Sequence, residues 1–287
     1  MNLLKVPFLM VCLLSIQTIL FAGNTNQTIY INSGVHACFD GAQMPFKAFN
    51  ASTSFSNRNV QLSAAIGDTI FLEVINTDSI QHGFDVKGLA GIRDTVAAND
   101  TINVAISSAS LGIFIYYDHI NNEDEAYLGL SGIFAVGVNS NTFFWNLKDH
   151  ELAVNDSVMT GGSVDWMTYY PDYFTINGAS NPNVNLDTTA RVEGAIGDTI
   201  LIYMANTGRA EHSIHFHGYH LEILFSTDHS NYVGRLKDTF PMKKMTGYVL
   251  RLVPDQTGEY PVHDHNLLSV TGGGLYPFGM FLTILIQ

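Results

Sequence analysis

Short apolar runs separated by turn-forming residues recur along almost the whole chain. The runs are rich in Ile, Val, Phe and Thr and are bounded by Gly, Asp, Asn and Ser, which is typical of β-strands. Helical periodicity is scarce, with 108–111 and 126–130 as the short candidates. The pattern therefore predicts an all-β protein. The clearest strand candidates are 69–75, 101–107, 113–117, 132–136, 199–204, 247–253 and 280–286.

An internal repeat divides this strand-rich chain in two. The segment Ala-Ile-Gly-Asp-Thr-Ile occurs at 65–70 and again at 195–200, an offset of 130 residues. A second block, 112–119, corresponds in the same order to 258–265. Matched blocks in the same order indicate a duplicated domain. We therefore expect two tandem antiparallel β-sandwiches with Greek-key strand order, over residues 24–138 and 143–287.

The composition excludes several classes of protein. With 46% hydrophobic and 14% charged residues, the 287-residue chain has enough apolar side chains for folded domains and is not disordered. Its net charge of −13, with 13 Lys and Arg residues, makes nucleic acid and anionic membranes poor partners. Beyond the N-terminal segment Cys38 is the single cysteine. No disulfide within the chain is therefore expected, and the fold must rest on its hydrophobic cores.

The N-terminal segment differs in character from the rest of the chain. Lys5 precedes an apolar run over 6–21, and the small residues Ala22 and Gly23 follow it. This arrangement is typical of a secretory signal peptide, which we assign to 1–22. It predicts a periplasmic or extracellular protein with no membrane partner after cleavage. A retained membrane anchor is the alternative, although the run is short for a span.

Two histidine-rich segments carry the most distinctive chemistry. His215 and His217 alternate in one strand-like segment, and His263 and His265 alternate in another. Side chains two residues apart on a strand share a face, so pairing of the two strands would bring four imidazoles together. Imidazole nitrogens suit copper or zinc. The alternative is a polar cluster without metal at the end of a sandwich, but the matched spacing favours a metal site.

These segments resemble motifs of the multicopper oxidases. His-x-x-His-x-His-Gly over 212–218 follows a Gly-Asp-Thr strand and an Asn-Thr turn, as in the last cupredoxin domain of that family. The expected Phe-Thr-Ile-Asn-Gly precedes it at 174–178, and Gly-Met-Phe follows at 279–281. Copper nitrite reductases are similar in the same region. The resemblance is strong over 165–287 and weak over 24–138, and it implies two tandem cupredoxin-like sandwiches.

The resemblance also implies roles for the individual histidines. The first histidine of the motif binds type 1 copper in multicopper oxidases, and this position is His212. The next two, His215 and His217, match ligands of the trinuclear cluster. The family's His-Cys-His triplet, which holds two further cluster ligands around the type 1 thiolate, reads His263-Asp264-His265 here. Because a carboxylate replaces the thiolate, a blue type 1 copper is not expected.

The first domain departs further from the family pattern. It keeps His82 at the position of His212. The segment 82–85 also resembles copper nitrite reductases, in which the aspartate acts in catalysis. We therefore expect catalytic roles for Asp85 and His82. The acidic run 123–125 is expected in a solvated loop, or at a copper-entry route. The residues that match the four histidines of the second domain are Asp85, Lys87, Tyr117 and His119.

Two functions fit these motifs. The first is a secreted copper-dependent oxidoreductase of reduced type, in which a small-molecule reductant binds at the metal and Asp85 and His82 of a neighbouring first domain transfer protons. The second is a non-catalytic cupredoxin whose partner is copper itself. Copper is preferred over zinc as the cofactor, although imidazole suits both. Related two-domain proteins are trimers with metal sites between subunits, so the resemblance implies a homotrimer.

Overall fold

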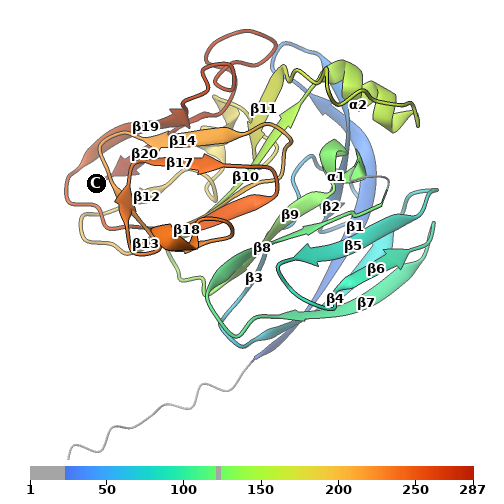
Figure 1. The fold of residues 1–287 in the computed structure, drawn as a ribbon, viewed down its shortest axis with the longest axis horizontal. Helices are drawn as coiled ribbons and strands as arrows, with labels where there is room; N and C mark the ends of the chain where they lie inside the picture. Colours follow the sequence, from blue (N-terminus) through green and yellow to red (C-terminus); the bar gives the residue numbers. More distant parts are fainter. Residues whose placement is uncertain (1–22, 121–123) are drawn as a thin grey trace, which may run out of the picture.

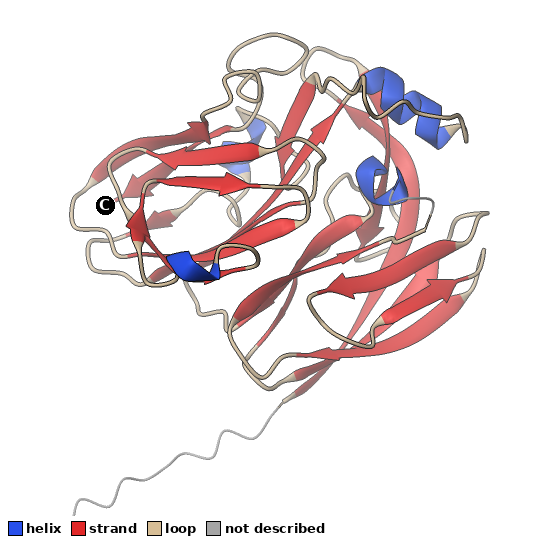
Figure 2. Cartoon of the chain, in the orientation of Figure 1, coloured by secondary structure: helices blue, strands red, loops and turns tan. Residues whose placement is uncertain are grey.

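The computed structural model describes residues 23–120 and 124–287 (Figure 1). The signal-peptide assignment to 1–22 and Glu123 of the acidic run lie outside the described residues. Strands make up most of the regular structure and the helices are short (Figure 2), so the all-β prediction is confirmed. Within the described ranges, no helix is both long enough and apolar enough to cross a membrane.

Two sheets form the N-terminal half of the molecule. One has the strand order β2-β1-β4-β7 and the other β3-β9-β8-β5-β6. Phe49, Leu72, Phe84 and Tyr116 are buried between them in one apolar core. The elements are β1 (Asn24–Ala37), β2 (Gln43–Asn50), β3 (Leu62–Ala64), β4 (Thr69–Asn76), β5 (His82–Lys87), β6 (Arg93–Val96), β7 (Thr101–Ser107), β8 (Gly112–Tyr117), α1 (Asp124–Leu128) and β9 (Ser131–Val136).

Two further sheets form the C-terminal half. Their strand orders are β11-β10-β13-β18-β15-β16 and β12-β20-β19-β14-β17. Trp145 stacks on Phe216 in the core between them. The elements are β10 (Thr142–His150), α2 (Leu152–Met159), β11 (Tyr173–Ile176), η2 (Asn183–Leu186), β12 (Glu193–Gly194), β13 (Ile200–Asn206), β14 (His212–Phe216), β15 (Leu221–Ser226), η3 (Ser230–Tyr232), β16 (Leu236–Lys237), β17 (Thr239–Met242), β18 (Thr246–Leu252), β19 (Gly258–Asp264) and β20 (Phe281–Ile286).

The two halves repeat the strand pairings that position the site. Asp85 pairs with Tyr117 across β5 and β8, and His215 pairs with His263 across β14 and β19. The repeat therefore extends from sequence to strand register. β10 begins at Thr142, one residue before the proposed start of the second domain.

A second pair of matched registers lies at the other end of the repeat. β1 runs parallel to β4 with Ile31 opposite Asn76, and β10 runs parallel to β13 with Leu147 opposite Asn206. Two residues further along the chain from each of these positions, Ser33 is equivalent to Asp149, and Asp78, just after β4, is equivalent to Gly208, just after β13. Aspartate therefore occupies non-equivalent positions in the two halves, Asp78 in the first and Asp149 in the second.

Strands were easier to predict than helices. Each strand candidate is present, with ends shifted by at most two residues. Of the helix candidates, 126–130 overlaps α1, but 108–111 is a bend. The helix α2 was not predicted because it buries little of its surface, with Asn155 and Val158 as its buried residues, and so lacks a clear apolar stripe.

Candidate metal centre

The structure brings His215, His217, His263 and His265 together at one end of the paired strands β14 and β19. The ring centroid of His215 lies 4.7 Å from that of His217 and 4.5 Å from that of His265. The rings of His217 and His263 are 5.2 Å apart. His217 and His265 are exposed, and the other two are partly buried. Four imidazoles therefore share one solvent-accessible site.

Gly218 shapes the chain directly after the first histidine pair. Its φ of 78° lies in the left-handed region that favours glycine. A Cβ atom at this position would lie 2.4 Å from a ring carbon of Tyr260. Glycine therefore lets the chain leave β14 while His217 stays beside the pair from β19.

Hydrogen bonding fixes the tautomer of His263. Its Nδ1 lies 2.9 Å from the backbone carbonyl oxygen of Asp264, and a carbonyl only accepts, so Nδ1 carries the proton. The Nε2 lone pair of His263 then faces Nε2 of His217 at 3.0 Å. In the metal-free protein His217 donates a proton across this contact. A metal ion could take the place of that proton, with both Nε2 atoms as ligands.

His215 is oriented in a similar way. Thr239 donates its hydroxyl proton to Asp238 at 3.0 Å, so its oxygen accepts from Nδ1 of His215 at 2.9 Å. Nε2 of His215 is left as the ligand atom. Burial lowers the pKa of His215, and the neighbouring His265 and His217 lower it further, which favours the neutral form that binds metal. Partners of this kind commonly orient metal-bound histidines.

An apolar pocket of about 380 Å³ adjoins the histidine cluster. His217 and His263 form part of its wall, together with Leu267, Tyr276 and Phe281. Leu267 is 70% exposed, so the pocket opens directly to solvent. A small molecule could therefore reach the histidine nitrogens from outside.

His212 does not join the four histidines. It is buried, with Nδ1 2.6 Å from Asp264 and Nε2 3.3 Å from Asp149. Burial acts to lower the pKa of His212, but hydrogen bonds to the two carboxylates outweigh it and raise the pKa to about 9. The ring is therefore an imidazolium at neutral pH. Both nitrogens hold protons in hydrogen bonds, so the expected role as a metal ligand does not fit this geometry.

Asp264 points away from the histidine cluster, as strand alternation predicts, and is fully buried. One carboxylate oxygen binds His212, and the other accepts from the backbone N–H groups of Ser213 at 2.9 Å and Asn266 at 3.0 Å. Burial would raise the pKa of Asp264, but its bond to His212 and these backbone donors lower it. A charged residue thus fills the position where the resemblance places a copper-binding thiolate.

The first half contains the same arrangement. His82 is fully buried, with Nδ1 2.7 Å from Asp118 and Nε2 3.2 Å from Asp78. The second oxygen of Asp118 accepts from the backbone N–H groups of Gly83 at 2.7 Å and Ile120 at 2.9 Å. We call each Asp–His–Asp group a triad: Asp78–His82–Asp118 in the first half and Asp149–His212–Asp264 in the second.

The two triads differ in where one carboxylate comes from. On the ring Nε2, the first half uses Asp78, in the turn after β4, whereas the second uses Asp149, on β10. The equivalent of Asp78 is Gly208, and a Cβ there would lie 1.9 Å from the Asp149 carboxylate. The equivalent of Asp149 is Ser33, which donates a hydrogen bond to Asp78 at 3.1 Å. The carboxylate has changed its position in the chain but not its place against the ring.

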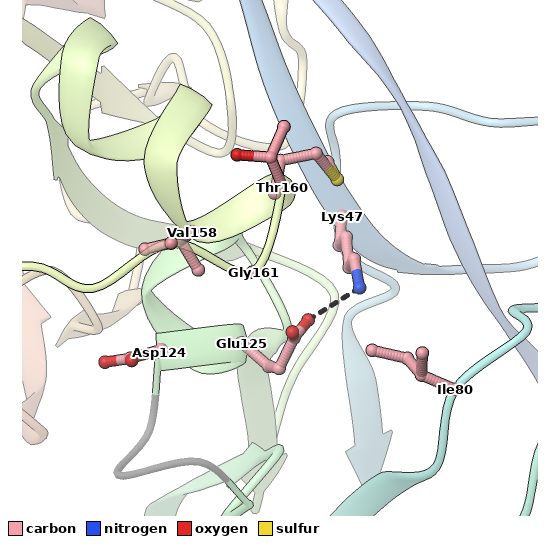
Figure 3. A pocket seen from close by; sticks show the side chains of 9 residues that line it. Lys47, Ile80, Asp124, Glu125, Val158, Thr160 and Gly161 are labelled. Atoms are coloured by element: carbon pink, nitrogen blue, oxygen red, sulfur yellow. Dashed lines mark ion pairs between the residues drawn. The ribbon is translucent and has the colours of Figure 1, made fainter.

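Lys47 supports the triad of the first half. Its Nζ lies 2.9 Å from Asp78 and 2.8 Å from Glu125, in the wall of a pocket of about 500 Å³ (Figure 3). Glu125 is buried on α1, so its expected place in a solvated loop was wrong. Ligand atoms of Glu125, His82 and Asp118 lie within 4.8 Å of one another, but Lys47 already neutralises Glu125.

The two residues expected to act in catalysis lie in the first half, away from β14 and β19. Asp85, on β5, forms an ion pair with Arg93 at 2.5 Å and accepts a hydrogen bond from Tyr117 at 3.3 Å. His82 has both nitrogens bonded within its triad. A site that combined Asp85 with the four histidines would therefore need a second copy of the chain.

Comparison with known proteins agrees with this architecture. A family model described as multicopper oxidase matches residues 155–277. The solved structure of a multicopper oxidase, mgLAC, is similar with a TM-score of 0.75 and 19% identity over 92% of this chain and 87% of that one. A blue copper oxidase from Nitrosomonas europaea gives 0.74 and 20%, over 92% and 86%. No curated protein matches the sequence.

A copper nitrite reductase from Nitrosomonas europaea is also similar, with a TM-score of 0.72 and 14% identity over 92% of this chain and 94% of that one. At these identities the structures share the fold, while the family match rests on the second half. Together they confirm the expected resemblance: the chain has a fold similar to that of multicopper oxidases and copper nitrite reductases.

Proposed function

We propose that this two-domain cupredoxin protein binds copper at His215, His217, His263 and His265 and acts as a secreted copper-dependent oxidoreductase of reduced type. The observation that carries the proposal is the close approach of four imidazole rings: the ring centroid of His215 lies 4.7 Å from that of His217 and 4.5 Å from that of His265, and Nε2 of His217 lies 3.0 Å from Nε2 of His263. Neutral imidazole is a ligand that copper prefers, and the fold is that of copper oxidoreductases.

The residues around the site support metal binding rather than a chance cluster. Thr239 and the Asp264 carbonyl hold the rings of His215 and His263 in fixed tautomers before any metal arrives. The site is open, so a ligand position remains for a substrate. Zinc would fit the same nitrogens, and copper is proposed because of the family resemblance.

Copper held there would pass electrons between a reductant and an acceptor by changing between its two oxidation states. Position 264 carries a carboxylate, so we propose that no type 1 copper collects electrons at a distance. The reductant would instead be a small molecule that binds in the pocket beside His217 and His263. Secretion to the periplasm or extracellular space is proposed from the N-terminal segment.

Proton transfer is assigned to Asp85 of a neighbouring copy, which implies an oligomer, and we propose a homotrimer. Asp85 occupies the position equivalent to His215, on the face of the first half that corresponds to the metal face. Its contacts with Arg93 and Tyr117 hold the carboxylate in place. His82 would act through the buried triad, since none of its surface is exposed.

A non-catalytic copper-binding or copper-buffering protein is the second candidate. The observation that favours it is the first half, where the four equivalent positions hold Asp85, Lys87, Tyr117 and His119 and therefore supply little of a larger copper cluster. Turnover separates the two candidates, because both require copper at the same four histidines.

The direct test is copper retention after loading and desalting. The wild type should keep on the order of one to two copper ions per chain, since four imidazoles fill one site or half of a larger one. The double variant His217→Ala, His265→Ala should keep none, whereas His229→Ala, outside the cluster, should match the wild type. Equal retention by the double variant would refute the site.

Activity is then measured with a phenol and with ascorbate under air. Oxidation that depends on bound copper and disappears in the His217→Ala, His265→Ala variant would support the oxidoreductase. Copper retention without oxidation of either compound would favour the buffering role.

A further inference from the structure

The two triads have the same pattern of hydrogen bonds, although the two halves carry different side chains at the four positions of the proposed metal site. In each, a histidine donates from Nδ1 to an aspartate at the end of the neighbouring strand or directly after it, and that aspartate also accepts from two backbone N–H groups. The second half adds one feature: its aspartate lies between two of the proposed ligands, His263 and His265. A change in the position of Asp264 must therefore move both ligands.

The bonds of Asp264 connect every segment that carries the proposed ligands. Its carboxylate binds His212 and the Ser213 backbone at the start of β14, and the Asn266 backbone beyond β19. Its own carbonyl oxygen accepts from Nδ1 of His263. His212 is held in turn by Asp149 from the other sheet of the sandwich. The chain of contacts thus runs from the far sheet to the ligand ring.

We infer that Asp264 is a positioning residue, which His212 and Asp149 hold in place so that it sets His263 and His265 in their metal-binding geometry. The inference rests on the proposed function, because it concerns the same site. The triad thus connects β14 to β19 on the face opposite the four histidines. The position of Asp264 is the one at which the resemblance places a metal-bound thiolate. Such partners beyond the ligands typically change metal affinity about 10- to 100-fold when removed.

The first half offers a matched control. Asp264→Ser and Asp118→Ser remove equivalent carboxylates from the two triads, but Asp118 lies between Tyr117 and His119 and not between two proposed ligands. Both variants should be less stable to heat. Only Asp264→Ser should bind copper about 10- to 100-fold more weakly and show an altered electron paramagnetic resonance spectrum.

A second experiment keeps the test valid if Asp264→Ser does not fold. Asp149→Ser acts one step further away, on the other side of His212, and should weaken copper binding less. Adding Gly208→Asp to Asp149→Ser recreates the arrangement of Ser33 and Asp78 in the first half, with the carboxylate supplied from the turn. The double variant should bind copper more tightly than Asp149→Ser but less tightly than the wild type, because a Cβ at position 208 would also lie 2.8 Å from the backbone nitrogen of residue 149. Gly208→Asp alone should be harmful, because its side chain would meet the Asp149 carboxylate.

A metal-free measurement completes the set. With ¹⁵N-labelled histidine, the Nδ1 proton of His263 should be protected in the wild type and in Asp118→Ser, and lost or shifted in Asp264→Ser. Wild-type affinity, spectrum and His263 resonance in Asp264→Ser would overturn the positioning role, as would wild-type affinity and spectrum in Asp149→Ser. Failure of the wild type to bind copper would instead refute the proposed function.

Discussion

The two halves of the molecule differ on the face that carries the proposed metal site and agree in the layer beneath it. The second half presents four histidines, whereas the equivalent face of the first half carries Asp85, Lys87, Tyr117 and His119. Below both faces, a buried histidine lies between two carboxylates. An exposed histidine can be substituted on its own, since water solvates the groups that it leaves behind. A buried charged residue cannot, because its partner would remain buried without an opposite charge, which costs several kcal/mol of stability.

The relocated carboxylate illustrates this constraint. Asp78 and Asp149 occupy positions that are not equivalent in the repeat, yet both bind Nε2 of the triad histidine. Where one half has aspartate, the other has a small residue that leaves room for it, Gly208 or Ser33. The charge against the ring has been retained although the residue that provides it has changed.

Removing one triad carboxylate should have the largest effect on stability. Asp118→Ala and Asp264→Ala each leave a buried histidine without one of its partners, and each should lose about 3–5 kcal/mol of unfolding free energy. Calorimetry of the two variants measures the loss. If the two triads are equivalent, the two losses of unfolding free energy will be similar. A small loss in either variant would show that the triads do not stabilise the two halves equally.

Alkaline pH should weaken the triad of the second half. The pKa of His212 is raised from 6.5 to about 9. A raised pKa contributes stability that is complete below pH 6.5 and is lost as the pH rises through 9. The difference in Tm between the wild type and His212→Gln should therefore narrow from pH 6 to pH 10. A constant difference across this range would mean that His212 is not charged in the folded protein.

Asp85 is predicted to matter for turnover and not for folding. If it transfers protons to the site of a neighbouring copy, Asp85→Asn should lower the rate roughly a hundredfold. Its Tm should stay close to that of the wild type, because the partner Arg93 is mostly exposed. Asp94→Asn, an exposed carboxylate on the next strand, is the control. Equal activity in the two variants would remove Asp85 from the mechanism.

Restoring histidines to the first half gives the smallest predicted change, a factor of about two. The triple variant Asp85→His, Lys87→His, Tyr117→His, together with His119, would place four imidazoles at positions that match the second half. Copper retained per chain should roughly double, since the registers of the two halves are the same. A folded variant with unchanged copper content would show that the first half differs from the second in more than the side chains at these four positions.

The sequence was sufficient to predict the strands and the grouping of the four histidines, but not the buried partners of His212 and Glu125. Alternation at His215–His217 and His263–His265 predicted which side chains share a face, because strand geometry determines it locally. The repeat predicted that Asp118 and Asp264 are equivalent. It could not show that Asp149 replaces Asp78, since that partner comes from a different strand at no fixed offset. Without that contact His212 resembled a metal ligand, and Glu125 resembled a solvated residue until its buried partner Lys47 was visible.

X-ray absorption of the copper-loaded wild type tests the central claim most directly, because it reports the atoms bound to copper. The account predicts a coordination sphere of nitrogen and oxygen with the multiple-scattering pattern of imidazole, and a pale protein without an intense blue band. Loss of the imidazole signal in His217→Ala, His265→Ala should accompany loss of copper. Sulfur bound to the metal would contradict the account, and an intense blue colour would in addition place a thiolate, such as that of Cys38, at the copper.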